Sequence, residues 1–318
     1  MGKLFNHEIN NNSWEEIFQS IDAFEPLVKA IFKKHGLILD KIENLTPGTN
    51  AVFKVGDKVI KIFAPVESGY YDIDYFEIER EAQSHVNSRD VASPKLLFCG
   101  EIRDRYAFKY IIMELVKGRE AGETLPTFTA AQKRDFAAQI LDISNKINVK
   151  MDSATIPLLP HKSHLAGDEW KEYSKGLRDE RAAVIQGIPW DNLVYVHGDM
   201  TAENMIIDEN GGACLIDFAD SHIAPYYYEW MPIVFGLFKC DPVMMAAYFG
   251  EYCSEQFYDK LTHSVLIHEF GALGVKELCE VKGLDIGALV DVSCLRDFLI
   301  ALTPFPATQP PLASQSSV

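Results

Sequence analysis

The most constraining feature of this chain is a run of polar residues set around two short apolar strands. It begins Tyr195-Val-His-Gly-Asp199-Met-Thr-Ala-Glu-Asn204-Met-Ile-Ile207 and resumes, after Asp-Glu-Asn-Gly-Gly, as Ala-Cys-Leu-Ile-Asp217-Phe. Two apolar runs separated by a glycine-containing polar turn predict a β-hairpin. Such a hairpin would hold Asp199, Asn204 and Asp217 near one another in space.

This grouping suits phosphoryl transfer from a nucleotide. The reaction needs a carboxylate that accepts a hydroxyl proton, and oxygen ligands that hold Mg²⁺ against the phosphates. We predict Asp199 as the base, and Asn204 and Asp217 as the metal ligands. The spacing H-x-D-x-x-x-x-N matches a kinase catalytic loop, and Asp217 stands where the second metal-binding Asp belongs. Any one of these residues alone would pass for an ordinary loop residue, but the set in this strand context favours the functional interpretation.

A lysine inside an apolar strand is the second candidate. The runs Ala51 to Val55 and Lys58 to Phe63 flank Gly-Asp and predict a hairpin. The charge of Lys61 among Val, Ile and Phe needs a reason, and kinases use such a lysine to contact the α- and β-phosphates, steadied by a Glu on the next helix. The competing interpretation is an edge-strand lysine that faces water. The turn before these strands, with Gly48, would lie over the phosphates.

Charge and composition limit the partners. The formal net charge of −16 argues against a nucleic-acid partner and would favour a cationic substrate if some of the acid lines a cleft. No apolar run is long enough to cross a membrane, and the first residues lack the apolar core of a signal peptide, so we expect a cytoplasmic protein with no membrane partner. The six cysteines form no C-x-x-C pair, which predicts reduced thiols and no zinc site.

The segments V-H-G-D-M-T-A-E-N-M-I-I and L-I-D-F resemble the aminoglycoside phosphotransferase and choline kinase-like small-molecule kinases. In that family Gly commonly stands where protein kinases carry the Arg of H-R-D, as Gly198 does here. The resemblance implies an α+β, two-lobed protein-kinase-like fold, with a small antiparallel-sheet N-terminal lobe and a mostly helical C-terminal lobe. We expect these lobes at 1–113 and 114–302, followed by a disordered tail at 303–318 that is rich in Pro and Ser.

The same resemblance suggests which glutamate orients Lys61. The helix expected from Tyr75 to Val86 carries Glu77, Glu79 and Glu81. By alignment with the family, Glu81 is the predicted partner of Lys61. Glu77 is the fallback, because it shares a helix face with Glu81 at i,i+4 spacing.

The resemblance also implies an interlobe hinge that binds the nucleotide base. It follows the apolar strand that ends at Met113. Glu114 would offer its carbonyl group and Val116 its N–H, with Met113 at the back of the pocket.

The segment after Asp217 separates small-molecule kinases from protein kinases. Ala219 replaces the Gly of D-F-G, and a helix is expected within about ten residues, which leaves no room for an activation segment. Where the family usually has an Asp that braces the catalytic loop, this chain has Glu229. The sequence leaves the role of Glu229 open, together with those of Asp220 and His222 near the expected acceptor site.

These observations predict an enzyme that moves the γ-phosphate of ATP or GTP to a hydroxyl group of a small, cationic molecule. Family resemblance and acidic charge make an aminoglycoside-type antibiotic the first choice of acceptor. One alternative is a metabolic kinase for choline, ethanolamine, a sugar or an amino alcohol. The aromatic residues from Tyr226 to Trp230 could then form a cage for quaternary ammonium, although they equally suit a core. A non-catalytic kinase-fold nucleotide-binding protein is the other alternative, disfavoured because all five expected polar positions are occupied.

Overall fold

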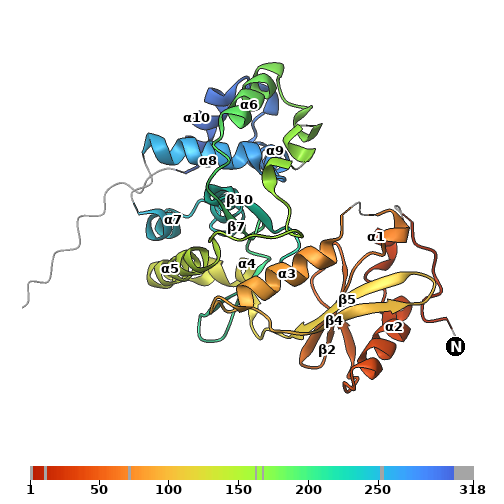
Figure 1. Cartoon of the computed structure of the whole chain (residues 1–318). Helices are drawn as coiled ribbons and strands as arrows, with labels where there is room; N and C mark the ends of the chain where they lie inside the picture. The colour runs from red at the N-terminus through yellow and green to blue at the C-terminus, as the bar shows by residue number, and fades with distance from the viewer. Residues whose placement is uncertain are drawn as a thin grey trace, which may run out of the picture.

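Two lobes make up the chain, as Figure 1 shows with the first in red to yellow and the second in green to blue. The computed structural model describes residues 3–10, 13–70, 73–161, 163–166, 168–250 and 254–303. A five-stranded sheet with helices forms the first lobe, and helices dominate the second, so the predicted α+β two-lobed fold is confirmed. The limits 1–113 and 114–302 stay predictions, and all but the first residue of the predicted 303–318 tail lies outside the described residues.

The sheet of the N-terminal lobe is antiparallel throughout, in the order β1-β2-β3-β5-β4. The predicted hairpin is present, because β2 and β3 pair from Ala51 with Ile62 to Val55 with Lys58. The strands are β1 (Ile42–Asn44), β2 (Ala51–Val55), β3 (Lys58–Ile62), β4 (Leu96–Arg103) and β5 (Ala107–Glu114), and the helices are α1 (Trp14–Ile17), α2 (Ile21–Lys34) and α3 (Tyr75–Asn87).

Alternation along the strands decides what each face of this sheet buries. Ile60 and Ile62 of β3 point into a core that also contains the apolar face of α2. Val59 packs on the opposite face against Phe76 of α3. Because successive strand residues point to opposite faces, Lys61 lies on the α3 side, above the cleft between the lobes.

The C-terminal lobe holds the predicted catalytic hairpin. Strands β8 and β9 pair antiparallel from Met205 with Leu215 to Ile207 with Ala213, and β6 extends this small sheet. A second antiparallel pair joins β7, which precedes the hairpin in sequence, to β10, which follows it. The strands are β6 (Arg119–Glu120), β7 (Leu193–Val196), β8 (Met205–Ile207), β9 (Ala213–Leu215) and β10 (His222–Pro225).

Helices surround these strands and supply the main core of the lobe. No helix within the described ranges is both long and apolar enough to cross a membrane. Of the six cysteines, the five in these ranges are free thiols. The helices are α4 (Ala121–Thr124), α5 (Ala130–Ile147), α6 (Lys175–Gly187), the π-helix Pro232–Leu237, α7 (Pro242–Phe249), α8 (Glu255–Ile267), α9 (Gly271–Lys282) and α10 (Val292–Leu302).

Candidate active site

A buried ion-pair network joins the two lobes at Lys61. Its Nζ lies 2.7 Å from Glu79 Oε2 of α3 and 2.8 Å from Asp217 Oδ1 of the other lobe. Burial by itself would lower the pKa of the ammonium, but the carboxylates of Asp217 and Glu79 outweigh it and raise the pKa of Lys61. With β3 in the middle of the sheet and Lys61 only 4% exposed, the solvated edge-strand interpretation is wrong.

The structure corrects the predicted partner of Lys61, which is Glu79 and not Glu81. Residues three and four apart share a helix face, and Phe76, Glu79 and Gln83 form the buried face of α3. Glu81 is half-buried and forms no ion pair in the part of the chain that the structure describes. The fallback, Glu77, bonds instead to Arg80 at 2.8 Å.

The catalytic loop between β7 and β8 brings Asp199 and Asn204 into contact. Asn204 Nδ2 donates to Asp199 Oδ2 at 2.6 Å and to the Asp199 carbonyl oxygen at 3.0 Å. Burial, and then the neighbouring carboxylates of Asp220 and Asp217, raise the pKa of Asp199 to about 8, although the Asn204 hydrogen bond opposes this. A carboxylate with a pKa near neutrality suits the acceptance of a proton from a hydroxyl group.

His197 connects this loop to the strand that precedes Asp217. Its Nδ1 accepts the N–H of Asp199 at 3.2 Å, so the proton of the neutral ring is on Nε2, which lies 3.1 Å from the carbonyl oxygen of Ile216. Burial lowers the pKa of His197 to about 4. His197 is therefore neutral, and its ring bridges the segments that carry Asp199, the predicted general base, and Asp217, the predicted metal ligand.

Glu229 and His268 hold the backbone of the loop at Gly198. Glu229 Oε1 accepts the Gly198 N–H at 2.6 Å, and His268 Nε2 lies 2.9 Å from the Gly198 carbonyl oxygen. A Cβ at position 198, where φ is +88°, would lie 2.0 Å from the carbonyl oxygen of Asp220, so only glycine fits. Glu229 thus braces the catalytic loop, a role that the sequence left open. The sequence analysis did not single out His268, since a lone histidine carries no motif.

The buried carboxyl group of Glu229 should make stability depend on pH. Burial raises its pKa to about 7, so between pH 4.5 and 7 the folded chain keeps a proton that the unfolded chain releases. The corresponding stability is present below pH 4.5 and is lost as pH rises through 7. The Glu229→Gln side chain does not titrate and still offers an oxygen to Gly198. We expect the unfolding free energy of the wild type, minus that of this variant, to fall by roughly 3 kcal/mol across this range.

Chemical denaturation at a series of pH values measures this difference. Subtracting the variant removes the contribution of His197, which titrates in both proteins. A difference that stays constant across the range would show that Glu229 is ionised throughout in the folded protein.

Asp217 closes the site from the end of β9. Burial by itself would raise its pKa, but the charge and hydrogen bond of Lys61 lower it, so Asp217 is an ionised ligand candidate. Because Asn204 Nδ2 bonds to Asp199, its oxygen remains for a cation. No cluster of three or more His, Cys, Asp or Glu side chains suited to a metal occurs in the described ranges. One carboxylate and one amide oxygen fit Mg²⁺, which takes few protein ligands and completes its shell with water and phosphate.

Asp220 and His222 lie directly behind this loop. His222 Nδ1 is 2.7 Å from the Asp220 carbonyl oxygen, and its Nε2 is 3.7 Å from Glu269 Oε2. His222 is buried, and the carboxylate of Asp220 contributes to the raised pKa of Asp199. Both residues therefore lie beside Gly198 of the predicted catalytic loop, and their roles stay open.

The residues predicted to bind the nucleotide base lie at the junction of the lobes. Met113 is buried, with its sulfur 3.9 Å from Gln83 Nε2. The N–H of Leu115 bonds to the Asp57 carbonyl oxygen, whereas that of Val116 enters no backbone hydrogen bond seen in the described chain. Glu114, which ends β5, is exposed. The contacts of Met113, Glu114 and Val116 with a base stay predictions.

The loop that contains Gly48 faces the other lobe. Thr46 Oγ1 donates to Glu120 Oε1 of β6 at 2.5 Å, which ties the loop to the far side of the hinge. Gly48 is exposed, and an added Cβ would have no atom within 4 Å. This openness leaves space above the cleft, and the predicted phosphate contact of Gly48 is untested.

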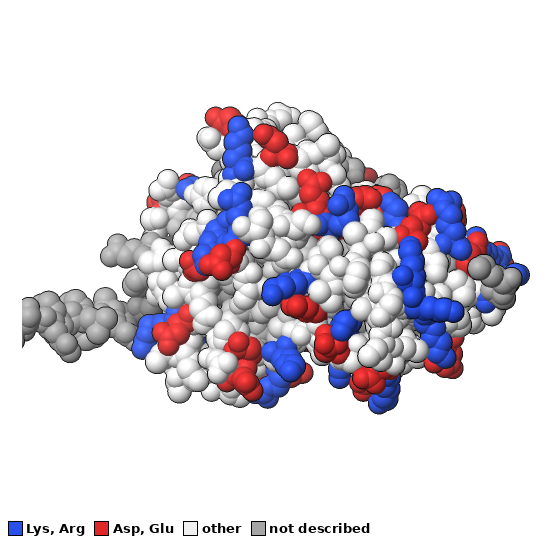
Figure 2. All heavy atoms as spheres, turned by 60° about the horizontal axis from the view of Figure 1, so that its bottom comes forward, with Lys and Arg blue, Asp and Glu red and all other residues white. Residues whose placement is uncertain are grey.

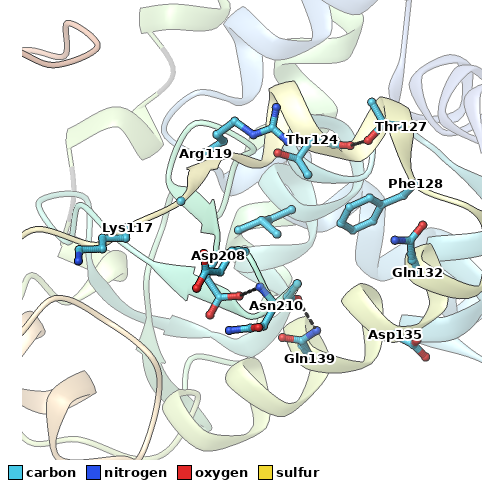
Figure 3. Close-up of a pocket in the computed structure, with 14 residues that line it drawn as sticks. Lys117, Arg119, Thr124, Thr127, Phe128, Gln132, Asp135, Gln139, Asp208 and Asn210 are labelled. Atoms are coloured by element: carbon cyan, nitrogen blue, oxygen red, sulfur yellow. Dashed lines mark hydrogen bonds between the residues drawn. The ribbon is translucent and has the colours of Figure 1, made fainter.

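A cavity of about 1160 Å³ lies away from the predicted catalytic and metal-binding residues (Figure 3). It opens between the start of α5 and the β8–β9 turn, where Gln139 bonds to the backbone of Gly211 and Ala213. Its lining is polar, with Lys117 and Arg119 opposite Asp208. None of the predicted catalytic or metal-binding side chains lines it.

Of the four aromatic residues from Tyr226 to Trp230, Tyr228 belongs to the core, whereas Tyr226 is 42% exposed. Tyr228 is buried and stacks on His268 with ring centroids 4.3 Å apart. Trp230 stacks on Phe257, and Tyr226 carries Lys260 over its ring at 5.2 Å. The cavity beside Asp199 includes none of these four aromatic residues. These aromatic residues therefore form no cage for an ammonium group beside Asp199, the predicted general base.

The fold and the grouping of Lys61, Asp199 and Asp217 define a protein of the kinase-like class. A model of the phosphotransferase enzyme family matches residues 47–261, well over half of the chain. The chain therefore belongs to the phosphotransferase enzyme family. A comparison with curated proteins found no match.

Solved structures of similar fold include aminoglycoside phosphotransferases. The GDP complex of wild-type aminoglycoside 2'-phosphotransferase-IIIa has a TM-score of 0.58 at 17% identity, covering 87% of this chain and 96% of that one. Aminoglycoside phosphotransferase APH(4)-Ia gives 0.56 at 17% identity, over 87% and 97%. ADP-bound APH(2'')-Ib gives 0.54 at 17% identity, over 88% and 99%. At these identities the likeness supports the fold.

Proposed function

We propose that this phosphotransferase moves the γ-phosphoryl group of ATP or GTP to a hydroxyl group of a small cationic molecule. Asp199 accepts the proton as the hydroxyl oxygen bonds to the γ-phosphorus, while the bond to the bridging oxygen breaks and a nucleoside diphosphate leaves. The observation that carries this proposal is the meeting of Asp199, Asn204, Asp217 and Lys61 at the cleft, with Lys61 held by Glu79.

Lys61 would exchange its bond to Asp217 for the nucleotide phosphates, while Glu79 keeps it in place. Mg²⁺ bound to Asn204 and Asp217 would neutralise phosphate charge. The hinge residues Glu114 and Val116 would hold the base against Met113, and the Gly48 loop would cover the phosphates. The relatives crystallised with GDP and with ADP support a nucleoside diphosphate product without choosing between ATP and GTP.

We propose a cationic acceptor, with aminoglycoside-type antibiotics as the first class to test. The support is the family and the formal net charge of −16. On the face shown in Figure 2, acidic and basic side chains are interspersed, as on a surface without a nucleic-acid footprint. A need for ATP or GTP and Mg²⁺ also favours the cytoplasm as the location.

The test is a coupled assay of ADP or GDP release with Mg²⁺. Kanamycin, choline, ethanolamine and simple sugars serve as acceptors, and Asp199→Asn as the control. Turnover on one class, abolished in the variant, would support the reaction and name the class. Nucleotide binding with no turnover on any acceptor would favour the non-catalytic alternative, and turnover restricted to neutral or anionic acceptors would contradict a cationic substrate.

A further inference from the structure

A cavity of about 600 Å³ opens directly beside Asp199. Its floor is the catalytic loop with Asp199 and Glu203, one wall is the π-helix Pro232–Leu237, and the other is α9. Asp199, the predicted general base, lines this cavity. When the hydroxyl group of an acceptor contacts Asp199, the rest of the acceptor would therefore occupy the cavity.

The wall formed by α9 carries large apolar side chains that are open to solvent. Leu273 and Val281, eight residues apart on one helix face, are 56% and 81% exposed, and Phe270 just before the helix is 37% exposed. Val281 and Leu273 are among the most exposed large apolar side chains in the described chain.

Helix α9 packs closely against Met231, which directly precedes the π-helix. A Cβ added at Gly274 would lie only 2.3 Å from Met231 Cε. Glu277 is also exposed and lies four residues from both Leu273 and Val281, so this face carries apolar side chains on either side of one carboxylate. Exposed apolar side chains that border a cavity indicate a binding site.

The charges in the cavity are mixed. Asp199, Glu203 and Glu277 face the ammonium groups of Lys239 and Lys282, so the carboxylates exceed the ammonium groups by only one. Glu203, Glu277, Lys239 and Lys282 form no ion pair with other side chains of the described residues. A ligand with several positive charges would be repelled by the two lysines. A ligand with a single amine can instead pair with one of the carboxylates.

Lys239 is held in this wall by an unusual backbone. Two left-handed residues, Lys239 at φ 50° and Cys240 at φ 59°, follow the π-helix at positions where glycine is the usual choice. The Cys240 N–H bonds to the Val234 carbonyl oxygen at 2.9 Å and fixes this turn. A charged residue in such a conformation keeps a positive charge in the cavity at a conformational cost.

We infer that the acceptor is an amphipathic amino alcohol, whose hydroxyl group reaches Asp199 while an extended apolar face packs on Phe270, Leu273 and Val281 of the α9 wall. This inference rests on the proposed function, because it names the substrate class of the same site. A single amine beside Glu277 or Glu203 satisfies the carboxylates. A polar polycation leaves the α9 wall exposed to water and brings extra charge near Lys239 and Lys282.

The test is binding of a homologous series, N-butyl-, N-hexyl- and N-octylethanolamine, in the presence of ADP and Mg²⁺. The head group is the same throughout the series, so differences in the dissociation constants measured by calorimetry report the contribution of the alkyl chain to binding. We expect affinity to rise about threefold for each added methylene, because each is removed from water on α9. Kanamycin, a polar polycation without an alkyl chain, is the reference and should bind more weakly than N-octylethanolamine.

Two surface variants locate the effect. The double variant Leu273→Ser with Val281→Ser should remove most of the dependence on chain length. Ile38→Ser is the matched control, because Ile38 is 90% exposed and lies in the other lobe. Affinity that does not rise with chain length, or a rise that survives the double variant, would overturn the inference. ADP release that Asp199→Asn leaves unchanged would instead overturn the proposed function.

Discussion

Replacing Asp199 with Asn is expected to lower kcat by about 10³-fold, within the range that a general base contributes. The amide cannot take the proton from the acceptor, but it keeps the shape and the oxygen that accepts from Asn204. Nucleotide affinity should change by less than about threefold, since this side chain faces the acceptor cavity. Steady-state kinetics with the acceptor found by the assay, and ADP binding by calorimetry, measure the two effects.

The same substitution should leave the fold intact or make it more stable. Burial raises the pKa of Asp199 because a buried negative charge is costly, and the neutral amide removes that cost. Asp191→Asn, an identical change at an exposed position, is the control for both measurements. A kcat within threefold of the wild type would remove Asp199 from the role of base.

Replacing Glu79 with Gln is expected to lower kcat/KM for the nucleotide by about 10²-fold. The change removes one of the two carboxylates that position Lys61, and breaking a buried ion pair costs up to about 3–5 kcal/mol. Because the amide oxygen of the variant can still accept a hydrogen bond from Lys61, we expect the loss to fall at about 2–3 kcal/mol, which corresponds to roughly 10²-fold.

The matched variant is Glu81→Gln, two residues further along the same helix. Glu81 is half-buried and makes no ion pair within the described chain, so its kcat/KM should stay within about twofold of the wild type. A larger loss in Glu81→Gln than in Glu79→Gln would show that Glu81 is the partner of Lys61, as the alignment with the family suggested.

The polar residues that act together were predictable where they lie close in the chain. Asp199 and Asn204 precede one short, strongly patterned hairpin and Asp217 follows it, so the structure brings them near one another as expected, while their roles stay predictions. The glutamate on α3 was not predictable from spacing alone, because 77, 79 and 81 all belong to one helix and the alignment did not set its rotation. Phe76 and Gln83, three residues before and four after Glu79, mark the buried face that the sequence analysis overlooked.

The supports of the catalytic loop come from distant segments. Glu229 and His268 meet at Gly198 only because β10, the segment after it and the end of α8 fold over the loop. The apolar wall of α9 likewise resembles any buried helix stripe in the sequence. Its exposure and its position beside Asp199 depend on tertiary packing, which one sequence does not encode in any local pattern.

The bridge from Lys61 to Asp217 has a consequence for the order of binding. In the free protein an ammonium group already balances the carboxylate that a divalent cation would need, so the cation alone must compete with a buried lysine for Asp217. A nucleotide offers that lysine new anionic partners and frees the carboxylate. Metal and nucleotide should therefore strengthen each other's binding, and a cell rich in magnesium would not fill this cleft until the nucleotide arrives.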